Sequence, residues 1–403
     1  MSSEWKTYTV QELIDAGMLD EPLDGNHGSI HPKASDYVSA GVPFIMANDL
    51  VNGKVDYANC AYITEAQAST LRKGFAKPGD VLLTHKATIG RTAIVSDEYD
   101  TIILTPQVTY YRVKKGISNR YLKYYFDSST FQQLFANWAG SGSTRAYLGI
   151  TAQRKLPIVL PPYEVQLKIA KCCGVLDDKI YQNQRINDNL EQQAKAIFSK
   201  EFLTLETLPN GWKRASLIDI ADYLNGLAMQ KYRPTADETG IPVLKIKELR
   251  QGCCDDNSEL CSPNIKSEYI IHDGDVIFSW SGSLLVDFWC GGICGLNQHL
   301  FKVTSSNYDK WFYYSWTKHH LDRFVAVAAD KATTMGHIKR DELAKAEVLI
   351  PNEADYKRIR TLLQPIYDLI ITNRIENKRL AKIRDTLLPK LMSGELDVSA
   401  IQL

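Results

Sequence analysis

The chain has 403 residues, of which 44% are apolar, and it carries 47 basic and 47 acidic side chains, so its formal net charge is zero. This length predicts two or three domains, and the apolar fraction is enough for ordinary hydrophobic cores. Nucleic-acid binding through bulk positive charge is excluded, so any such binding must come from local patches or from a partner.

The first part of the chain reads as short strands and helices separated by glycine and proline turns. The expected elements are, in order, a helix over residues 10–16, a strand over 41–50 followed by a turn at Asn52-Gly53, a helix over 64–73, a buried strand over 81–84, a polar loop over 85–91 with a returning strand, a strand over 102–113, an amphipathic helix over 119–136, and a glycine-serine loop over 140–150.

The second half of the chain repeats this order. The stretch GIPVLKIKEL (240–249) matches GVPFIMANDL (41–50), and DGDVIFSWSGSLL (273–285) matches PGDVLLTHKATIG (78–90). Further on, LNQHLFKV (296–303) matches TPQVTYYRV (105–113). A period this long, present in two copies, indicates a tandem duplication of an α+β domain of about 150 residues and not a solenoid.

Each copy is followed by a long amphipathic segment, over residues 161–205 and from residue 351 onward, with a shift of 190 residues between them. Apolar residues with 3-4 spacing, interrupted by two asparagines at the same phase, are typical of a coiled-coil seam, and buried asparagines fix its register. The seam residues are Ile169, Leu176, Ile180, Asn183, Asn187 and Leu190 in the first segment, and Ile359, Ile366, Ile370, Asn373, Asn377 and Leu380 in the second.

Two such helices in one chain most simply pair with each other. The alternative is that each lays its apolar face on its own domain. In either case we expect a first domain over residues 1–160, a long helix over 161–207, a second domain over 208–351, and a second long helix with a C-terminal tail over 352–403.

Signals of catalysis are weak. LPPYE (160–164) resembles the Asn-Pro-Pro-Tyr signature of amino-methyltransferases, but Leu160 stands where the reactive amide is needed. Asp177, Asp178 and Lys179 lie between seam positions and are better explained as a solvated helix face. The eight cysteines lack the paired C-x₂-C spacing of structural zinc, so we expect reduced thiols and no metal site. No run approaches about 18 apolar residues and no signal peptide is evident, so we expect a cytoplasmic protein without membrane contact.

DNA reading is the stronger hypothesis. Arg, Lys, small hydroxyls and aromatic side chains suit contacts with base edges and phosphates, and loops of this composition recur at matching places in both copies. The candidate DNA-binding residues are His85, Lys86, Thr88, Arg91, Ser143, Thr144, Arg145 and Tyr147 in the first domain, and Lys245, Lys247, Ser279, Trp280, Ser281, Ser283, Lys331, Thr333, Thr334 and His337 in the second. We place Lys245 and Lys247 on the strand that matches Met46 and Asn48.

Taken together, the ordered set of motifs resembles the specificity subunit of type I restriction-modification systems. The stretches that carry the resemblance are LPNGWK, GIPVLKIKEL, GDVIFSWSGSLL with GLNQHLFKV, the two segments containing NQRINDNLEQ and NRIENKRLAK, and the terminal TLLPKLMSGELDV. They span nearly all of the chain.

The resemblance implies two target-recognition domains that each read one half of a split sequence in double-stranded DNA. It implies that the two long helices pair as an antiparallel coiled coil that acts as a ruler. It also implies two modification subunits, which bring S-adenosylmethionine and adenine methylation, and restriction subunits that add DNA cleavage. The chain itself would then be non-catalytic and without a cofactor of its own. The alternative is an assembly scaffold or decoy that binds methyltransferase subunits without reading DNA.

Overall fold

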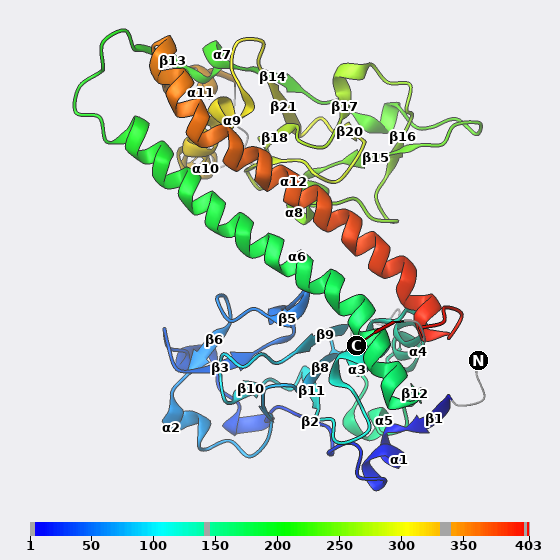
Figure 1. The fold of residues 1–403 in the computed structure, drawn as a ribbon. Coiled ribbons are helices and arrows are strands. Elements are labelled where there is room, and N and C mark those ends of the chain that lie inside the picture. The colour runs from blue at the N-terminus through cyan, green and yellow to red at the C-terminus, as the bar shows by residue number, and fades with distance from the viewer. Residues whose placement is uncertain (1–4, 141–145, 331–339, 399–400, 403) are drawn as a thin grey trace. The chain divides into compact units, whose positions relative to one another are not determined.

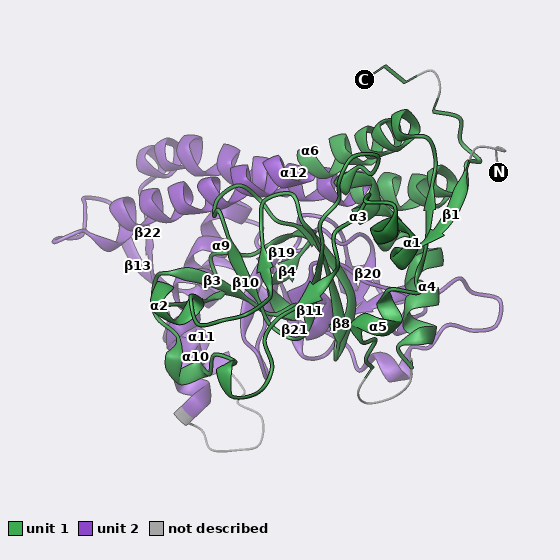
Figure 2. Cartoon of the chain, turned by 90° about the horizontal axis from the view of Figure 1, so that it is seen from below, with its two compact units in different colours: residues 1–178, 381–403 green, residues 179–380 purple. Residues whose placement is uncertain are grey.

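We describe the protein from a computed structural model that defines residues 5–140, 146–330, 340–398 and 401–402. The chain forms two compact units (Figure 2): unit 1 contains residues 1–178 and 381–403, and unit 2 contains residues 179–380. The boundary between the units cuts both long helices, so each unit holds one globular part and a piece of each helix. Among the described residues, no helix combines the length and the apolar character that a membrane crossing needs.

The globular part of unit 1 is a set of small β-sheets. Its strands are β1 (Lys6–Thr9), β2 (Leu23–Asp24), β3 (Val42–Ile45), β4 (Leu50–Val51), β5 (Gly53–Val55), β6 (Ala61–Ile63), β7 (Phe75–Ala76), β8 (Val81–Lys86), β9 (Thr88–Ile94), β10 (Ile102–Leu104), β11 (Val108–Tyr111) and β12 (Pro157–Leu160). One sheet has the order β2-β11-β8-β9-β5-β4, another the order β6-β3-β10-β7, and β1 pairs with β12. Within the second of these, β3 and β10 run parallel.

The helices of this part are α1 (Val10–Asp15), α2 (Glu65–Ala68), α3 (Asn119–Asp127), α4 (Ser129–Trp138) and α5 (Ile150–Gln153). The predicted helix over 10–16 is confirmed by α1. The single helix predicted over 119–136 is wrong, because the chain breaks at Ser128, whose backbone is extended (ψ 141°). The Ser128 hydroxyl accepts a hydrogen bond from the Phe131 N–H at 3.3 Å, so this serine starts a second helix as its N-cap.

Other expectations for unit 1 are corrected by local side-chain chemistry. The helix predicted over 64–73 ends at Ala68, because the Ser69 and Thr70 hydroxyls each donate to backbone carbonyls three residues earlier at 2.7 Å and compete with the helix. The strand predicted over 102–113 is two strands, β10 and β11. The polar loop predicted over 85–91 is instead the tip and returning strand of the β8–β9 hairpin. The predicted Asn52-Gly53 turn is confirmed, and both residues have positive φ.

Unit 2 repeats the sheets of unit 1. Its strands are β13 (Lys213–Ser216), β14 (Asp222–Asn225), β15 (Ile241–Leu244), β16 (Leu260–Cys261), β17 (Ile270–Ile271), β18 (Val276–Ser279), β19 (Leu285–Phe288), β20 (Cys294–Leu296), β21 (Leu300–Thr304) and β22 (Glu347–Ile350). The sheet orders β14-β21-β18-β19 and β16-β15-β20-β17 correspond to β2-β11-β8-β9 and β6-β3-β10-β7, and β13 pairs with β22 as β1 does with β12. The parallel pair recurs as β15 and β20. The predicted tandem duplication is therefore confirmed.

The helices of this globular part are α7 (Leu217–Ile220), α8 (Ile246–Gln251), α9 (Lys310–His319), α10 (Leu321–Asp330) and α11 (Arg340–Ala344). The strand predicted over 240–249 is too long, because β15 ends at Leu244 and the next residues form α8. The Glu248 carboxylate accepts from the Lys245 N–H at 3.3 Å, which caps the helix. Lys245 is thus the N-cap residue of α8, and Lys247 lies within the helix and not on a strand.

The two long helices are α6 (Tyr163–Phe198), which continues as a short π-helical stretch over Ser199–Leu203, and α12 (Glu353–Met392) (Figure 1). At about 1.5 Å per residue they are roughly 54 and 60 Å long, and they confirm the two predicted long helices. Pro162 and Pro351 precede their first turns. Proline suits this place because its missing N–H would have no partner inside the helix.

Within unit 2 the two helices pair through the predicted asparagines. The Asn183 side-chain amide donates to Asn377 Oδ1 at 2.9 Å, and the Asn373 amide donates to Asn187 Oδ1 at 2.9 Å. Asn187 lies further along α6 than Asn183, but its partner Asn373 lies earlier in α12 than Asn377, so the two helices are antiparallel. Asn373 and Asn377 are the repeat equivalents of Asn183 and Asn187, 190 residues later. The first asparagine of each helix therefore pairs with the second asparagine of the other.

Apolar residues of both long helices also enter the cores of the globular parts. In unit 1, Ile169 and Cys173 of α6 and Leu388 and Leu391 of α12 join one buried cluster with Phe126. In unit 2 the corresponding cluster contains Ala194, Phe198, Ile359, Leu363 and Ile370. The two sequence hypotheses for the helices therefore both hold in part: the helices pair with each other, and they also anchor the globular parts.

Candidate nucleic-acid interface

The two loops proposed to read DNA in the first domain are joined in unit 1. The Ala87 N–H donates to the Ala146 carbonyl at 2.9 Å, and the Leu148 N–H donates to the His85 carbonyl at 3.0 Å. Lys86 and Tyr147 form an isolated antiparallel bridge. We call residues 85–91 and 146–148 the first tip. Ala87 turns the hairpin at φ 64°, a left-handed conformation that non-glycine residues seldom adopt.

Several side chains of the first tip face solvent. Lys86 and Arg91 are exposed, Thr88 is half-buried, and Tyr147 is 50% exposed. The Lys86 ammonium lies 5.9 Å from the centroid of the Tyr147 ring. A cation beside an aromatic face and a hydroxyl can contact a phosphate, a base edge or the face of a base.

His85 is different, because it is 0% exposed. Its Nδ1 lies 3.1 Å from the Leu148 carbonyl oxygen, and its Nε2 lies 4.0 Å from Asp24 Oδ2. Burial lowers the pKa of His85, although the Asp24 carboxylate opposes this shift. The prediction that His85 touches DNA does not fit its burial. The imidazole instead links the hairpin at residue 85 to the segment over residues 146–148.

Two features of this surface escaped the sequence reasoning. The Gln132 amide donates to the Gly90 carbonyl at 2.9 Å, and Gly90 has a φ of +84°, a left-handed conformation that favours glycine at this position of β9. Trp138 is 45% exposed at the end of α4. Together with Leu148 and Lys155 it lines a hollow of about 380 Å³. The sequence signal that could have indicated this hollow is the tryptophan just before the glycine-serine loop.

The matching hairpin of unit 2 connects β18 and β19, and we call residues 279–284 the second tip. Ser279 is 0% exposed, and its hydroxyl donates to the Ser281 and Ser283 carbonyls at 3.3 and 2.9 Å. Ser281 is 2% exposed, with its hydroxyl 3.0 Å from His299 Nδ1. The predicted DNA contacts by Ser279 and Ser281 therefore do not fit their burial, and both serines shape the turn. Ser283 is exposed.

Trp280 is half-buried in the second tip. Its indole N–H donates to Asn225 Oδ1 at 3.0 Å, and its ring packs 5.6 Å from Phe301 and 6.3 Å from His299. These contacts hold one face and the polar edge of the indole against the sheet. A fixed, partly exposed aromatic ring is suited to pack against a base or a thymine methyl group.

The two candidate lysines at the start of α8 are already paired with carboxylates. Lys245 Nζ lies 2.6 Å from Glu259 Oε1, and Lys247 Nζ lies 3.2 Å from Asp255 Oδ2. Lys247 is 61% exposed. Exposed ion pairs contribute little free energy, so a phosphate can replace these carboxylates at small cost.

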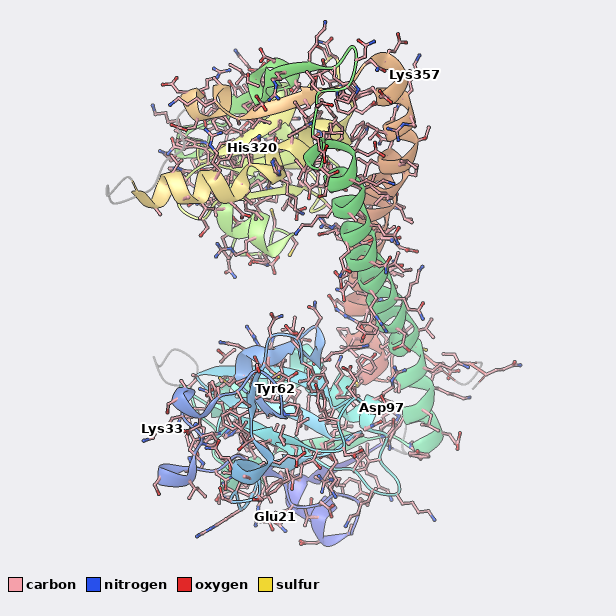
Figure 3. The ribbon with its side chains drawn as sticks, turned by 90° about the vertical axis from the view of Figure 1, so that its left-hand side faces the viewer. Glu21, Lys33, Tyr62, Asp97, His320 and Lys357 are labelled. Atoms are coloured by element: carbon pink, nitrogen blue, oxygen red, sulfur yellow. The ribbon has the colours of Figure 1, made fainter. Side chains whose placement is uncertain are left out.

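The remaining candidates, namely Ser143, Thr144, Arg145, Lys331, Thr333, Thr334 and His337, lie outside the described residues. Another histidine, outside the candidate set, has a structural partner. His320, labelled in Figure 3, follows α9, and its Nε2 lies 2.8 Å from the Glu347 carbonyl oxygen. In the described part of the chain no group of three or more His, Cys, Asp or Glu side chains has the arrangement of a metal site.

Electrostatic contacts tie each globular part to its pieces of the long helices. In unit 1, Asp177 of α6 accepts from Arg384 Nη1 at 2.6 Å and from the Tyr124 hydroxyl at 2.7 Å. In unit 2, Arg374 of α12 donates to Asp287 at 2.7 Å and to Glu191 of α6 at 2.8 Å. These contacts fix each globular part to its own pieces of the long helices.

Comparison with protein families gives one match that covers most of the chain. The model of the type I restriction modification DNA specificity domain matches residues 2–192 and again residues 209–384. The two matched ranges contain the two copies of the repeat and the greater part of each long helix.

Similar proteins carry related names. The type I restriction enzyme MjaIX specificity subunit of Methanocaldococcus jannaschii is 27% identical, with 98% of this chain and 95% of that protein covered. The HindI specificity subunit of Haemophilus influenzae is 20% identical, with 98% and 100% covered. A crystal structure of the type I restriction-modification system S subunit from M. genitalium has a TM-score of 0.57 at 14% identity, with 97% of both chains covered, which shows a shared fold.

Proposed function

The chain belongs to the type I restriction-modification DNA specificity family, and we propose from this membership that it selects the DNA sequence on which a restriction-modification complex acts. The observation that carries the proposal is the duplicated fold itself. Each copy presents a hairpin tip with aromatic and polar side chains at the same place in the sheet. Two similar readers in one chain suit a target that consists of two separate half-sites.

We further propose that the first tip reads one half-site through Lys86, Thr88, Arg91 and Tyr147. The second tip, with Trp280 and Ser283, reads the other, together with Lys245 and Lys247. The exposure of these side chains supports the assignment. The buried His85, Ser279 and Ser281 would act by positioning the tips. Near-zero net charge means that the isolated chain should bind DNA weakly, since few phosphates would be neutralised.

The paired long helices are proposed to set the number of unread base pairs between the half-sites. Reciprocal asparagine pairing supports this role, because each slip of one helix along the other would bury unpaired amides. A separation fixed by helix length can be changed by changing that length.

Partner subunits are proposed to supply the chemistry. In this proposal two methyltransferase subunits dock on the long helices, bind S-adenosylmethionine and methylate adenine, and restriction subunits add cleavage. Exposed apolar side chains on the helices support a docking role: Val175 is 60% and Ile383 48% exposed in unit 1, and Ile186 is 44% and Leu369 43% exposed in unit 2.

The position of Leu160 supports a non-catalytic chain. It is 5% exposed on β12, where it pairs with Lys6 of β1. The Pro-Pro-Tyr sequence that follows leads into α6. The residue before it is apolar, where a methyltransferase of that type would need a polar active-site side chain.

The proposal is tested by mapping methylated adenines in DNA from cells that express the chain with its methyltransferase partner, beside cells that lack the chain. We expect a split motif with two short defined halves and a constant spacer only when the chain is present. Methylation that is absent, or indifferent to the chain, would instead favour an assembly scaffold or decoy.

A further inference from the structure

A pair of cysteine side chains from separate segments meets in unit 2, beside the predicted DNA-contacting helix α8. Cys254 lies in the loop after α8 and is half-buried. Cys294 is the first residue of β20 and is 0% exposed. Both thiols pack on the same apolar cluster, and each shifts the pKa of the other.

The surroundings of the pair favour a thiolate on Cys254. The neighbouring Cys294 thiol lowers the pKa of Cys254, and the Lys378 ammonium acts in the same direction, while burial and the Glu248 carboxylate oppose both. Lys378 Nζ lies beside Gly292, 2.8 Å from where a Cβ would stand. The same thiol–thiol contact, together with burial, raises the pKa of Cys294.

The cysteines outside this loop behave differently. Burial raises the pKa of the thiols of Cys60, Cys172, Cys173, Cys261 and Cys290. A thiol is oxidised most readily where it is accessible, has a depressed pKa and lies next to a second thiol that can resolve the product. Cys254 meets these conditions, with Cys294 as the resolving thiol.

We propose that Cys254 and Cys294 form a peroxide-oxidisable dithiol that closes to an intramolecular disulfide. The Cys254 thiolate attacks one oxygen of a hydroperoxide, the O–O bond breaks, and Cys254 becomes a sulfenic acid while hydroxide, or alkoxide from an organic peroxide, leaves and takes up a proton. The Cys294 sulfur then attacks the sulfenic sulfur, the S–O bond breaks, and water leaves with the Cys294 proton. Two electrons pass from the two sulfurs to the peroxide, and the S–S bond forms.

The disulfide would tie the loop after α8 to β20. Asp255, next to Cys254, is the ion-pair partner of Lys247 at 3.2 Å, and the Asp255 N–H donates to the Ser258 hydroxyl at 3.0 Å. Oxidation therefore acts on the segment that holds Lys247. Its effect on reading of the second half-site rests on the proposed function, but formation of the disulfide does not.

The test is to treat the full-length chain with hydrogen peroxide, block remaining thiols with an alkylating agent, and search tryptic digests for a disulfide between residues 251–266 and 267–302. Because these peptides also contain Cys253, Cys261 and Cys290, variants locate the bond. We expect the cross-linked peptide in the wild type and in Cys253→Ser, its loss in Cys254→Ser and in Cys294→Ala, and its disappearance on treatment with dithiothreitol.

Cys253→Ser is the matched control, since Cys253 is adjacent and also half-buried but accepts a hydrogen bond from the Gln251 amide at 3.4 Å. Circular dichroism of each variant establishes that it is folded. The proposal is overturned if folded wild-type chain yields no cross-linked peptide, or if the cross-link persists in Cys254→Ser. If the mapping experiment shows no chain-dependent split motif for a chain that still forms the cross-link on peroxide treatment, the proposed function is refuted and the dithiol stands.

Discussion

The two hairpin tips differ in content although their frames are equivalent. His85 is the last residue but one of β8 in unit 1, and its backbone N–H donates to the Gln107 carbonyl at 2.9 Å. Trp280 follows the corresponding strand β18 of unit 2, and its backbone N–H donates to the His299 carbonyl at 3.4 Å. One side chain is a buried imidazole and the other a partly exposed indole. The backbone frame is thus shared, and the side chains it presents are free to differ.

The same contrast appears after the parallel strands β3 and β15. In unit 1 the chain enters a single 3₁₀ turn (Ala47–Asp49), and in unit 2 it enters the longer α8. In both, an acidic side chain accepts a hydrogen bond from the backbone N–H three residues earlier: Asp49 accepts from Met46 at 2.7 Å, and Glu248 accepts from Lys245 at 3.3 Å. Capping chemistry is retained while the residues that could meet DNA change.

The largest expected effects come from the helix anchors, which should be equally important in both units. Leu363→Ala in unit 2 and Ile169→Ala in unit 1 each remove a fully buried side chain and should lower the free energy of unfolding by about 2–5 kcal/mol. Hydrogen exchange should show the loss of protection mainly in the unit that carries the change. Leu362→Ala, at an exposed neighbour of Leu363, is the control and should stay within about 0.5 kcal/mol. Equal losses from Leu362→Ala and Leu363→Ala would contradict the anchoring role.

The contacts of Asp177 with Arg384 and Tyr124, which we call the charge clamp of unit 1, give the next largest effect. Burial raises the pKa of Asp177, but Lys123, Tyr124 and Arg384 outweigh it, so the pKa lies below its ordinary value. The stabilisation is present above the unfolded pKa and is lost as pH falls through the lower folded pKa. Asp177→Asn should therefore cost about 1–3 kcal/mol at pH 7, and its difference from the wild type should begin to narrow once the pH falls below about 4.

Asp178→Asn is the matched control for this clamp. Asp178 and its partner Arg120 are each 48% exposed, so its loss should cost less than about 1 kcal/mol. Urea unfolding of both variants across pH measures the difference. A gap between Asp177→Asn and the wild type that stays constant down to pH 2–3 would argue against an ionised Asp177 in the clamp.

Substitutions in the first tip should weaken recognition of the first half-site and leave the second half-site unaffected. Lys86→Ala and Tyr147→Ala are each expected to weaken binding of DNA with the correct first half-site by about tenfold, or roughly 1.4 kcal/mol, and to leave discrimination at the second half-site unchanged. Affinities of the assembled complex for DNA altered in either half measure this. Lys357→Ala, at an exposed lysine of α12 paired with Glu353 at 2.6 Å, is the control. Equal loss at both half-sites would show that the tips do not read separately.

The smallest effect on stability is expected from the asparagine pair. Asn187→Leu with Asn373→Leu removes both partners together, so stability should change by less than about 1 kcal/mol. Register should loosen, because the polar pair no longer excludes slipped alignments. Methylation mapping should then show more than one spacer length, whereas Asn189→Leu, on the exposed face, should not. A single spacer in the double variant would mean that the asparagines do not set register.

The duplication and the helix pair were predictable because both rest on periodic patterns. The seam residues and the phase of Asn183, Asn187, Asn373 and Asn377 follow from 3-4 spacing, and the contacts across the pair agree with it. Element ends were less predictable, since a single hydroxyl, as at Ser128, or a single carboxylate, as at Glu248, decides where a helix starts.

Composition marked both tips as candidate DNA contacts, and that assignment stays a prediction. Composition could not tell the buried His85, Ser279 and Ser281 from their exposed neighbours. Their burial depends on contacts with Leu148, with carbonyls of the turn, and with His299, which no local pattern encodes. The partnership of Cys254 with Cys294 likewise arises only when β20 folds next to the loop after α8.

If the paired helices set the distance between the two half-sites, a change in helix length must change the spacer. The test inserts one heptad in each helix at facing positions, after Ile180 in α6 and before Leu380 in α12, and maps methylated adenines. Seven residues add about 10 Å with nearly two full helical turns, which corresponds to about three base pairs. We expect the same two half-sites with a longer spacer. An unchanged spacer with both half-sites still recognised would contradict the proposed role of the helices.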